Sequence, residues 1–416
     1  MTNVLVIGGG GREHAVCHQL SKSNKIGKLF CVPGNAGIEK IASCKQMSVF
    51  DFDGIYEYVK ANQVDLVFVT PDDPLAKGMV DYFNERGVRA FGPTAGAARL
   101  ESSKAFSKEF MLRHKIPTAS SQIFDCPDKA KEYLRSTDYP VVIKSDGLAL
   151  GKGVIICADL DEAIKAIDDI MVSKAFGEAG NRVLIEEFLV GREVTVMAFC
   201  DGKHISLMPS SQDHKRAYDG DKGLNTGGMG AFAPSPFFTD SHRKEFLDKI
   251  ALPTVEGLIK DGIEFKGVLY FGLMMTAKGI KVIEYNSRLG DPETEAVLPL
   301  LSTDLIDIMN ACIDGTLDTV DVRWQDKVGF TVVIASGEYP LSVVKGHEIT
   351  IGELEDVILF HAGTAIKDGK LVNNGGRVFQ LTAVADDMDK AREAVYSQID
   401  KVHFANCRYR TDIGKV

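Results

Sequence analysis

The chain has 416 residues, more than the roughly 250 to 300 at which one hydrophobic core stops growing, so we expect about two to four domains. Its composition, 45% hydrophobic and 25% charged residues, is typical of a soluble globular protein, and no apolar run approaches the ~18 residues of a membrane span. The net charge of -10 and eight scattered cysteines without a C-x-x-C pair disfavour a nucleic-acid-binding face, a disulfide framework and a zinc site. Because the N-terminus has no basic n-region, we expect a cytoplasmic protein.

Short apolar strands alternate with helical stretches in the N-terminal quarter of the chain. The predicted strands are 4–7, 29–32, 66–70 and 89–91. Such alternation is typical of βαβ units and a parallel sheet. We therefore predict an α/β domain over residues 1–103, followed by a bridging helix over residues 104–117. In that helix Phe106 and Phe110 lie four residues apart, and Pro117 ends the pattern.

Two further segments follow the bridging helix. Residues 118–193 form a small module that can move, with a helix at 161–172 whose Ile164 and Ile167 share one face. The predicted strands of this module are 141–144, 154–157 and 183–188. Residues 194–326 form a larger subdomain that also contains a long polar stretch. Its predicted strands are 193–199, 268–275 and 281–285.

The C-terminal segment, residues 327–416, has the pattern of an α+β domain. Asp368-Gly369 and Asn374-Gly375 are strong hairpin-turn signals. A closing helix follows, with one apolar face made of Ala391, Val395, Ile399 and Val402. The whole chain is therefore predicted to be a multidomain protein of mixed α/β and α+β class.

A glycine-rich turn, Gly8-Gly9-Gly10-Gly11-Arg12-Glu13-His14, joins the first strand to the first helix. Its backbone N–H groups can meet a phosphate at the positive end of the helix. The dinucleotide fingerprint fails, because Glu13 occupies the third glycine position and Asn35 follows the second strand where an acidic residue is needed. A sugar monophosphate site fits better, and a purely structural turn remains the alternative.

Lys144 ends the buried strand Val141-Val142-Ile143 and precedes a loop that contains Gly151-Lys152-Gly153. A cation and free backbone N–H groups placed in this way can hold nucleotide phosphates. The loop lacks the G-x-x-x-x-G-K-[ST] spacing, so it is not a Walker loop. The simpler alternative is a strand followed by a flexible hairpin.

The segment Glu186-Glu187-Phe188-Leu189 ends another apolar strand. Its backbone edge can bind an adenine, and Glu193 can accept hydrogen bonds from ribose hydroxyls. Acidic residues at a strand end are more often simply solvated. Taken alone, this motif is therefore weak.

Glu284 and Asn286 lie two residues apart on a predicted strand, so their side chains share one face. Both offer the oxygen ligands that suit Mg²⁺ or, alternatively, Mn²⁺. Arg288 continues the same face and can stabilise a transferring phosphoryl group, and Asp291 lies in the next turn. A solvent-exposed edge strand explains the same polar residues, but not their coincidence with the other motifs.

The polar stretch holds Ser211-Gln212-Asp213-His214-Lys215-Arg216 and Asn225-Thr226-Gly227-Gly228-Met229-Gly230. Long polar loops inside compact domains are usually functional or disordered. The mixture of cationic and anionic groups suits a zwitterionic substrate. His214 alone can equally be a surface histidine, and no H-E-x-x-H metalloprotease motif occurs.

In this order the motifs resemble the ATP-grasp ligases, and among them the glycinamide ribonucleotide synthetase family, over essentially the whole chain. The motifs that carry the resemblance are G-G-G-G-R-E-H-A at 8–15, F-G-P-T at 91–94, E-S-S-K-A-F at 101–106, K-S-D-G-L-A-L-G-K-G-V at 144–154, I-E-E-F-L at 185–189, S-Q-D-H-K-R at 211–216, N-T-G-G-M-G at 225–230, G-D-P-E-T at 290–294, H-A-G-T at 361–364 and N-G-G-R-V at 374–378. The stretch from 211 to 230 is the most specific.

The resemblance implies a biotin-carboxylase-like N-terminal domain, an ATP-grasp core with a mobile lid at 118–193, and a C-terminal cap. It implies that ATP, glycine and 5-phosphoribosylamine react through glycyl phosphate to glycinamide ribonucleotide. By motif position, the nucleotide would contact Lys104, Lys144, Gly151, Lys152, Gly153, Glu186, Glu187, Leu189 and Glu193, and the metal Glu284 and Asn286. The other substrates would contact Gly9, Gly10, Gly11, Arg12, Glu13, Asn35, Asp72, Asp213, His214, Lys215, Gly228, Arg288 and Asp291. Of these, Arg288, Asp213 and Lys144 would act in catalysis.

Two departures from the family pattern matter. The strand before Glu284 holds no further acidic metal ligand, and Thr70-Pro71-Asp72 stands where the family usually has G-P-E. The chain ends where single-function members end, so we expect no fused enzyme, and we expect a monomer. The rivals are another ATP-grasp ligase or carboxylase, a non-catalytic nucleotide-binding regulator, and, disfavoured by Glu13 and Asn35, an NAD-dependent oxidoreductase.

Overall fold

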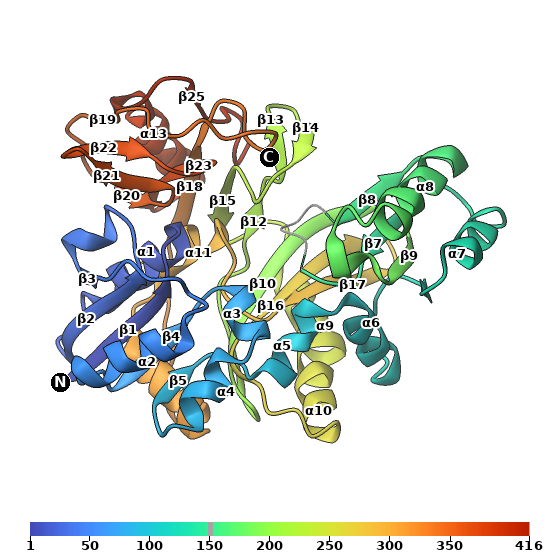
Figure 1. Cartoon of the computed structure of the whole chain (residues 1–416), viewed down its shortest axis with the longest axis horizontal. Coiled ribbons are helices and arrows are strands. Elements are labelled where there is room, and N and C mark those ends of the chain that lie inside the picture. The colour runs from blue at the N-terminus through green and yellow to red at the C-terminus, as the bar shows by residue number, and fades with distance from the viewer. Residues whose placement is uncertain (149–152, 416) are drawn as a thin grey trace.

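The computed structural model describes residues 1–148 and 153–415. Figure 1 shows the N-terminal sheet and the C-terminal sheet stacked on one side of the molecule, with the lid projecting to the other side. The core sheet that contains β10 (Gly191–Asp201), β16 (Lys266–Thr276) and β17 (Gly279–Asn286) lies between them. Within the described residues, no helix is long and apolar enough to cross a membrane.

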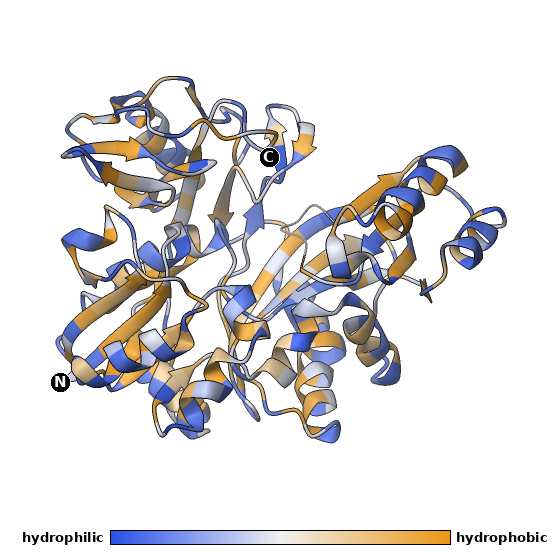
Figure 2. Cartoon of the chain, in the orientation of Figure 1, coloured by the Kyte–Doolittle hydropathy of each residue, from blue (hydrophilic) through white to orange (hydrophobic). Residues whose placement is uncertain are grey.

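The N-terminal domain is built on a five-stranded parallel sheet of order β3-β2-β1-β4-β5, as the alternating pattern predicts. Its strands are β1 (Thr2–Gly8), β2 (Ile26–Pro33), β3 (Ser43–Cys44), β4 (Leu66–Val69) and β5 (Arg89–Phe91). Both faces are covered, because Val4 and Val6 pack into one core whereas Leu5 and Ile7 pack into another. Figure 2 shows the central strands of this sheet as mostly hydrophobic. The helices of this domain are α1 (Gly11–Leu20), α2 (Phe52–Ala61), α3 (Asp72–Ala76), α4 (Met79–Asn84) and α5 (Ala95–Ser102).

The bridging helix is α6 (Lys104–Arg113). It begins at Ser103, whose hydroxyl accepts a hydrogen bond from the Phe106 backbone N–H at 3.2 Å. Phe110 is fully buried against the core sheet, and Phe106 is partly buried there. The predicted start of the helix is confirmed, and its end lies four residues before Pro117.

The lid module contains an antiparallel sheet of order β6-β9-β7-β8. Its elements are β6 (Ser121–Phe124), α7 (Pro127–Leu134), β7 (Val141–Ser145), β8 (Val154–Cys157), α8 (Leu160–Ile167) and β9 (Val183–Glu187). The predicted helix is confirmed, since a π-helical turn continues α8 to Val172. The strand pattern did not predict β6 or α7, which together with α8 contribute to a separate small core.

The larger subdomain is built on an antiparallel sheet of order β11-β10-β16-β17. Its register places Gly272 opposite Glu284 and Tyr270 opposite Asn286. The remaining elements of this region are β11 (Ile205–Leu207), β12 (Gln212–Asp213), β13 (Arg216–Tyr218), β14 (Lys222–Asn225), β15 (Gly230–Ala233), α9 (Asp240–Phe246), α10 (Leu252–Lys260), α11 (Glu293–Val297) and α12 (Leu305–Asp314).

The C-terminal sheet has the order β12-β15-β18-β23-β20, so it takes two strands from the polar stretch of the preceding segment. Its own elements are β18 (Val328–Ser336), β19 (Thr350–Ile351), β20 (Ile358–His361), β21 (Thr364–Lys367), β22 (Lys370–Asn373), β23 (Arg377–Ala385), α13 (Met388–Tyr396), β24 (Val402–His403) and β25 (Cys407–Arg408). The turn at Asp368-Gly369 joins the hairpin β21–β22, as predicted. Asn374-Gly375 forms no hairpin, because β23 pairs with β18 and β20 instead of β22. The predicted closing helix is shorter than expected, because α13 ends at Tyr396 and carries only Ala391 and Val395 of the four predicted apolar residues. Ile399 lies in a 3-10 turn and Val402 in β24, and all four are buried.

Candidate active site

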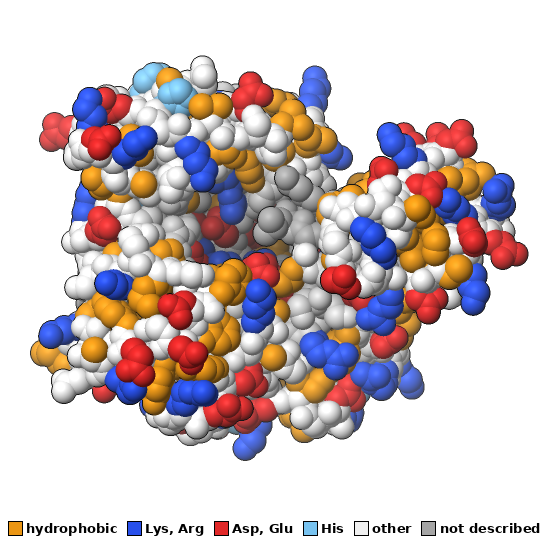
Figure 3. Space-filling model, in the orientation of Figure 1, with side chains coloured by type: hydrophobic (Ala, Val, Ile, Leu, Met, Phe, Trp, Pro, Cys, Tyr) orange, Lys and Arg blue, Asp and Glu red, His pale blue; other side chains and the backbone are white. Residues whose placement is uncertain are grey.

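A hollow lies between the N-terminal domain, the C-terminal domain and the lid (Figure 3). Figure 3 shows this hollow, with acidic and basic side chains at its floor. The glycine turn follows β1, Asn35 follows β2, and Asp72 follows β4. These strands are neighbours in the parallel sheet, and ligands bind outside the carboxyl ends of such strands. The fold therefore brings the three N-terminal motifs to one edge.

The glycine turn is held by the Glu13 carboxylate. Glu13 accepts hydrogen bonds from the Gly10 backbone N–H at 2.6 Å and from the Thr70 hydroxyl at 2.7 Å. It also pairs with the Arg12 guanidinium at 2.6 Å. The side chain fills the space beside Gly8, where a Cβ would lie 2.5 Å from Glu13 Cγ. Glu13 thus builds the turn, and contact of Gly9, Gly10, Gly11, Arg12 or Glu13 with substrate remains a prediction.

Asn35 joins the glycine turn to the C-terminal domain. Its amide nitrogen donates to the Gly9 carbonyl at 2.9 Å and to the His361 carbonyl at 2.7 Å. The His361 backbone N–H in turn donates to His14 Nδ1 at 2.8 Å. Burial, together with the charges of His361 and His18, lowers the pKa of His14 to about 3. This contact therefore requires a neutral His14.

Two buried lysines share the carboxylate of Glu186. Lys144 Nζ lies 2.9 Å from Glu186 Oε2, and Lys108 Nζ lies 3.1 Å from Glu186 Oε1. Lys144 also donates to the Ile283 carbonyl at 3.1 Å, next to the predicted metal strand. Burial lowers the pKa of Lys108, although the Glu186 charge opposes that shift. Lys108 was not predicted from the sequence, because its partner lies 78 positions away (186 minus 108) on another element.

Lys104 lies beside the loop that follows β7. Its Nζ donates to the Gly147 carbonyl at 2.8 Å, and the Asp146 carboxylate accepts from the Ser103 hydroxyl at 3.0 Å. Burial lowers the pKa of Lys104. Gly153 lies in the turn before β8, where its carbonyl accepts from the Ser145 N–H at 2.8 Å. The predicted residues Gly151 and Lys152 lie outside the described residues.

The other predicted nucleotide contacts surround the junction between the lid and the core. Glu187 pairs with Lys281 at 2.6 Å and accepts from the Ser120 N–H at 3.0 Å. Glu193 pairs with Lys215 at 2.7 Å. Leu189 is half-buried in the segment between β9 and β10. In this conformation the Glu187 pair connects the lid to the core sheet, and the Glu193 pair connects β10 to the polar stretch. Contact with ATP therefore requires these ion pairs to open or to be shared.

The Glu284 carboxylate is surrounded by cations without a direct partner. Burial alone would raise its pKa, but Lys215, Lys144, Lys104 and Arg288 hold the pKa below its usual value. Across the described residues, no hydrogen bond or ion pair within 4.0 Å is formed by this carboxylate. An ionised carboxylate with free oxygens is a suitable ligand for a divalent cation.

Asn286 completes this oxygen-donor face. The Asn286 amide forms hydrogen bonds with its neighbours when its nitrogen faces Glu101. In that orientation the nitrogen donates to Glu101 Oε1 at 3.0 Å and to the Tyr285 carbonyl at 3.3 Å. The amide oxygen then remains as an acceptor. Glu284 and Asn286 therefore fit a hard cation such as Mg²⁺, which takes one or two protein ligands besides phosphate and water.

A second buried charge network surrounds Asp213. Burial raises the pKa of Asp213 to about 7, with Glu293 and Glu193 acting in the same direction and Lys215 opposing them. Burial lowers the pKa of Lys215, but Asp213 and Glu193 together raise it well above its usual value. The charges of a cation and a titratable carboxylate thus act on each other here. This pair can recognise the two charged ends of a zwitterion.

His214 has a structural role in this conformation. Its Nε2 accepts from the Gly414 N–H at 3.4 Å. Burial and the Arg410 charge lower the pKa of His214 to about 4. The prediction that it contacts substrate is not supported by these contacts.

Arg377 joins three motifs at the edge of the hollow. Its guanidinium pairs with Asp291 Oδ1 at 3.0 Å and donates to the Gly227 carbonyl at 2.6 Å. Gly228 packs so closely on Pro292 that a Cβ would lie 2.4 Å from its Cδ. The motif N-G-G-R-V at 374–378 carries this arginine, but the sequence did not indicate that it would reach Asp291.

Family models match nearly the whole chain. The N domain of phosphoribosylglycinamide synthetase matches residues 2–101, its ATP-grasp (A) domain residues 102–294, and its C domain residues 329–416. The chain belongs to the phosphoribosylglycinamide synthetase family. These ranges lie close to the predicted domain boundaries at 103 and 327, and the finer division at 117 and 193 remains a prediction.

Two relatives in this family align along nearly their full length. The phosphoribosylamine-glycine ligase of Caldanaerobacter subterraneus subsp. tengcongensis is 45% identical over 412 residues, covering 99% of both chains. That of Listeria monocytogenes is 44% identical, again over 99% of both.

Solved structures agree with the fold of the family. The crystal structure of phosphoribosylamine-glycine ligase from Thermotoga maritima has a TM-score of 0.88 at 33% identity and covers 99% of this chain and 100% of its own. The biotin carboxylase domain of 2-oxoglutarate carboxylase from Hydrogenobacter thermophilus, solved with MgADP, has a TM-score of 0.75 at 16% identity, covering 98% and 92%. This second likeness confirms the predicted biotin-carboxylase-like architecture.

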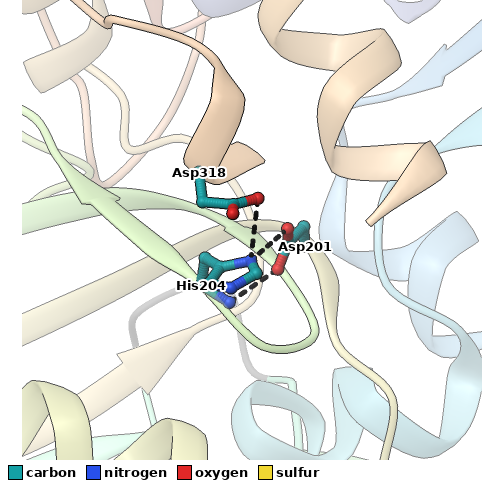
Figure 4. Close-up of side chains that lie close together, drawn as sticks. All are labelled: Asp201, His204 and Asp318. Carbon is teal, nitrogen blue, oxygen red and sulfur yellow. Dashed lines mark hydrogen bonds and ion pairs between the residues drawn. The ribbon is translucent and has the colours of Figure 1, made fainter. Parts of the chain in front are cut away.

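A separate His/Asp group consists of Asp201 and His204, within the range matched by the A-domain model, and Asp318, beyond that range. Figure 4 shows Asp201, His204 and Asp318 together, with His204 Nδ1 at 2.9 Å from Asp201 Oδ2 and 3.5 Å from Asp318 Oδ1. Asp201 already accepts from the N–H groups of Lys203, His204 and Leu317, at 2.6 to 2.9 Å. The group therefore connects the β10–β11 turn to the segment after α12, and these contacts account for it without a metal.

Proposed function

We propose that this chain uses ATP to join glycine to 5-phosphoribosylamine, giving glycinamide ribonucleotide, ADP and phosphate in purine biosynthesis. The observation that carries the proposal is the gathering of Lys104, Lys144, Lys215 and Arg288 around the ionised Glu284. Such a centre suits the meeting of a triphosphate, a divalent cation and a carboxylate, which otherwise repel one another. The names of the full-length relatives supply the two substrates.

Glu284 and Asn286 would hold Mg²⁺, which neutralises phosphate charge and orients the γ-phosphate when it is bound. Lys104 and Lys144 are among the cations whose charges act on Glu284, and they would supply fixed positive charge for the phosphates. Lys144 can turn from Glu186 to a phosphate, because Lys108 remains to balance the buried Glu186 carboxylate. Glu193 and the segment of Leu189 would contact the ribose and the adenine.

The first chemical step is attack of the glycine carboxylate on the γ-phosphorus of ATP. An O–P bond forms, the bond to the β–γ bridging oxygen breaks, and ADP leaves with that electron pair. Arg288 stabilises the phosphoryl oxygens during this transfer, and ionised Asp213 holds the ammonium group of glycine. Lys215, at 2.7 Å from Glu193, helps to keep Asp213 ionised.

The second step is attack of the unprotonated amine of phosphoribosylamine on the carbonyl carbon of glycyl phosphate. The C–N bond forms, phosphate leaves, and the amine proton passes to solvent or to the leaving phosphate. The glycine turn after β1, together with Asn35 and Asp72, would hold the sugar phosphate at the adjacent sheet edge. Closure of the lid at 118–193 would keep water from the acyl phosphate.

The test is ADP release from Mg-ATP by the purified protein. Glycine and phosphoribosylamine, the latter generated from ribose 5-phosphate and ammonia, are supplied singly and together. Release that requires both establishes the ligase. Release with a different acid or amine, or tight ATP binding without release, would overturn the substrate assignment and retain the ATP-grasp site.

A further inference from the structure

Glu101 is a buried carboxylate that the assigned motifs leave without a role. It lies near the end of α5, three positions before Lys104, and is only 7% exposed. Glu101 Oε2 accepts from the Ser287 backbone N–H at 2.9 Å and from the Ser287 hydroxyl at 3.0 Å. Glu101 Oε1 lies 2.8 Å from Arg288 Nη2 and accepts from the Asn286 amide at 3.0 Å. Three consecutive residues of one segment therefore contact one carboxylate.

These contacts use the full capacity of the carboxylate, which offers about four lone-pair sites to donors. Two of the donors belong to residues assigned here to the metal and to the transferred phosphoryl group. The contact with Glu101 fixes which atom of Asn286 points away, because a nitrogen bound to Glu101 leaves the oxygen as the available ligand. It also fixes the Arg288 guanidinium, which makes its other hydrogen bond, at 3.2 Å, to the carbonyl of Leu289.

We propose that Glu101 is a positioning residue, which orients Asn286 toward the divalent cation and Arg288 toward the transferred phosphoryl group. The proposal rests on the function proposed above, since it assumes that these two residues meet a metal-nucleotide. Through Ser103 and Lys104, the same chain segment also carries a phosphate-binding lysine. Glu101, on α5, thus contacts groups at and just beyond the end of β17, and lies close in sequence to Lys104 at the start of α6.

The decisive variant is Glu101→Gln. The glutamine oxygen can accept from two of the four donors, whereas its NH₂ group faces the remaining two and cannot accept from them. Nucleotide binding is measured by calorimetry with ADP, once with saturating Mg²⁺ and once with EDTA. We expect the affinity for ADP in EDTA to change by less than about twofold, and the gain in affinity from Mg²⁺ to fall by roughly 10- to 100-fold, the usual effect of an outer-shell partner.

The matched control is Asp201→Asn, which removes the charge from a buried carboxylate that accepts several N–H groups and lies at the opposite end of β10 from Glu193. We expect it to lower the thermal unfolding midpoint but to leave the Mg²⁺ dependence of ADP binding unchanged. Glu101→Asp, which keeps the charge with a shorter side chain, is expected to recover part of the lost Mg²⁺ effect. If the loss of a buried charge acted only by destabilising the fold, Glu101→Gln and Asp201→Asn would change the Mg²⁺ dependence of ADP binding alike.

Two outcomes would overturn the proposal. If Glu101→Gln folds and its ADP affinity depends on Mg²⁺ as in the wild type, the Glu101 contacts serve only the fold. Equal weakening with and without Mg²⁺ assigns Glu101 to the nucleotide pocket in general. Failure of the ligase proposal is distinguishable, because wild-type protein would then bind Mg-ADP but not require glycine and phosphoribosylamine for ADP release.

Discussion

The glycine turn and the metal strand differ in how their buried carboxylates are used. Glu13 accepts from Gly10 and Thr70 and pairs with Arg12, so its charge is balanced inside the turn that it builds. Glu284 has four cations nearby but no direct protein partner among the described residues. Buried charges usually have partners, so an ionised carboxylate without one marks the position where a ligand completes the structure.

The largest expected effect comes from removing the uncompensated charge. Glu284→Gln should lower kcat for ADP release by roughly 100- to 1,000-fold, as loss of a charge-stabilising group in an active site typically does. Because the carboxylate forms no hydrogen bond or ion pair with the described residues, the unfolding midpoint should change little. The measurements are steady-state kinetics and thermal unfolding.

The control for this variant is Glu264→Gln, since the Glu264 carboxylate pairs with Lys266 at the surface at 3.1 Å. It should leave both quantities unchanged. A Glu284→Gln protein that keeps wild-type kcat would remove the metal strand from the mechanism and would end the contrast between the two regions.

The charge network around Asp213 should make the use of glycine depend on pH. Burial raises the pKa of Asp213 to about 7. Below that pH the carboxyl is protonated and cannot hold the ammonium group of glycine, so kcat/KM for glycine should fall up to about tenfold per pH unit. Lys215 opposes the shift, so Lys215→Met should move the inflection to higher pH, whereas Lys215→Arg should retain it. An inflection that stays in place in Lys215→Met contradicts the assignment.

Glu13, whose charge is balanced by Arg12, should affect folding instead of metal binding. Glu13→Gln removes one of the oxygen atoms that accept from Gly10 and Thr70, and it leaves the Arg12 guanidinium without its carboxylate partner. We expect this to lower the free energy of unfolding by about 2 to 4 kcal/mol. Urea unfolding followed by circular dichroism measures the loss. The affinity for Mg-ADP should remain that of the wild type. Unchanged stability would show that the turn does not depend on Glu13.

Local patterns in the sequence predicted the elements and the residue types of the site. Alternating apolar segments indicated β1, β2, β4 and β5, and the spacing of Glu284 and Asn286 placed both on one face of β17. The two-residue strand β3 was too short to give such a pattern. Asn374-Gly375 has the composition of a hairpin turn, but composition does not specify that β23 pairs with β18.

Long-range partners could not be predicted in this way. Glu101 and Lys108 lie on helices, where a charged residue most often faces solvent, and their partners Ser287 and Glu186 are far away in the sequence. Similarly, the polar stretch gave no sign that β12 and β15 would join the C-terminal sheet. Only the tertiary fold brings these groups together.

The contact between the glycine turn and the C-terminal domain should weaken in acid. Burial lowers the pKa of His14 to about 3 and of His361 to about 4, from an ordinary value of 6.5. Between these values the unfolded chain binds protons that the folded chain does not, so stability falls as the pH drops below 6.5, by up to about 1.4 kcal/mol per pH unit for each histidine. Thermal unfolding at pH 7.5 and about pH 5.5 measures the slope. His14→Gln, which keeps an acceptor for the His361 N–H, should reduce it.

The smallest effect has the opposite sign and comes from His204. The hydrogen bond to Asp201 raises the pKa of His204, so its contribution to stability is present below pH 6.5 and is lost as the pH rises through the folded-state pKa. Its side chain is 42% exposed, and solvent screening should limit the contribution to less than about 1 kcal/mol. His204→Gln should therefore lower the unfolding midpoint slightly at pH 5.5 and not at pH 8.5. An equal loss at both pH values would mean that the ring acts through packing alone. A loss at pH 5.5 only would show that His204 stabilises the fold as a charged group, in contrast to His14 and His361, which stabilise it as neutral groups.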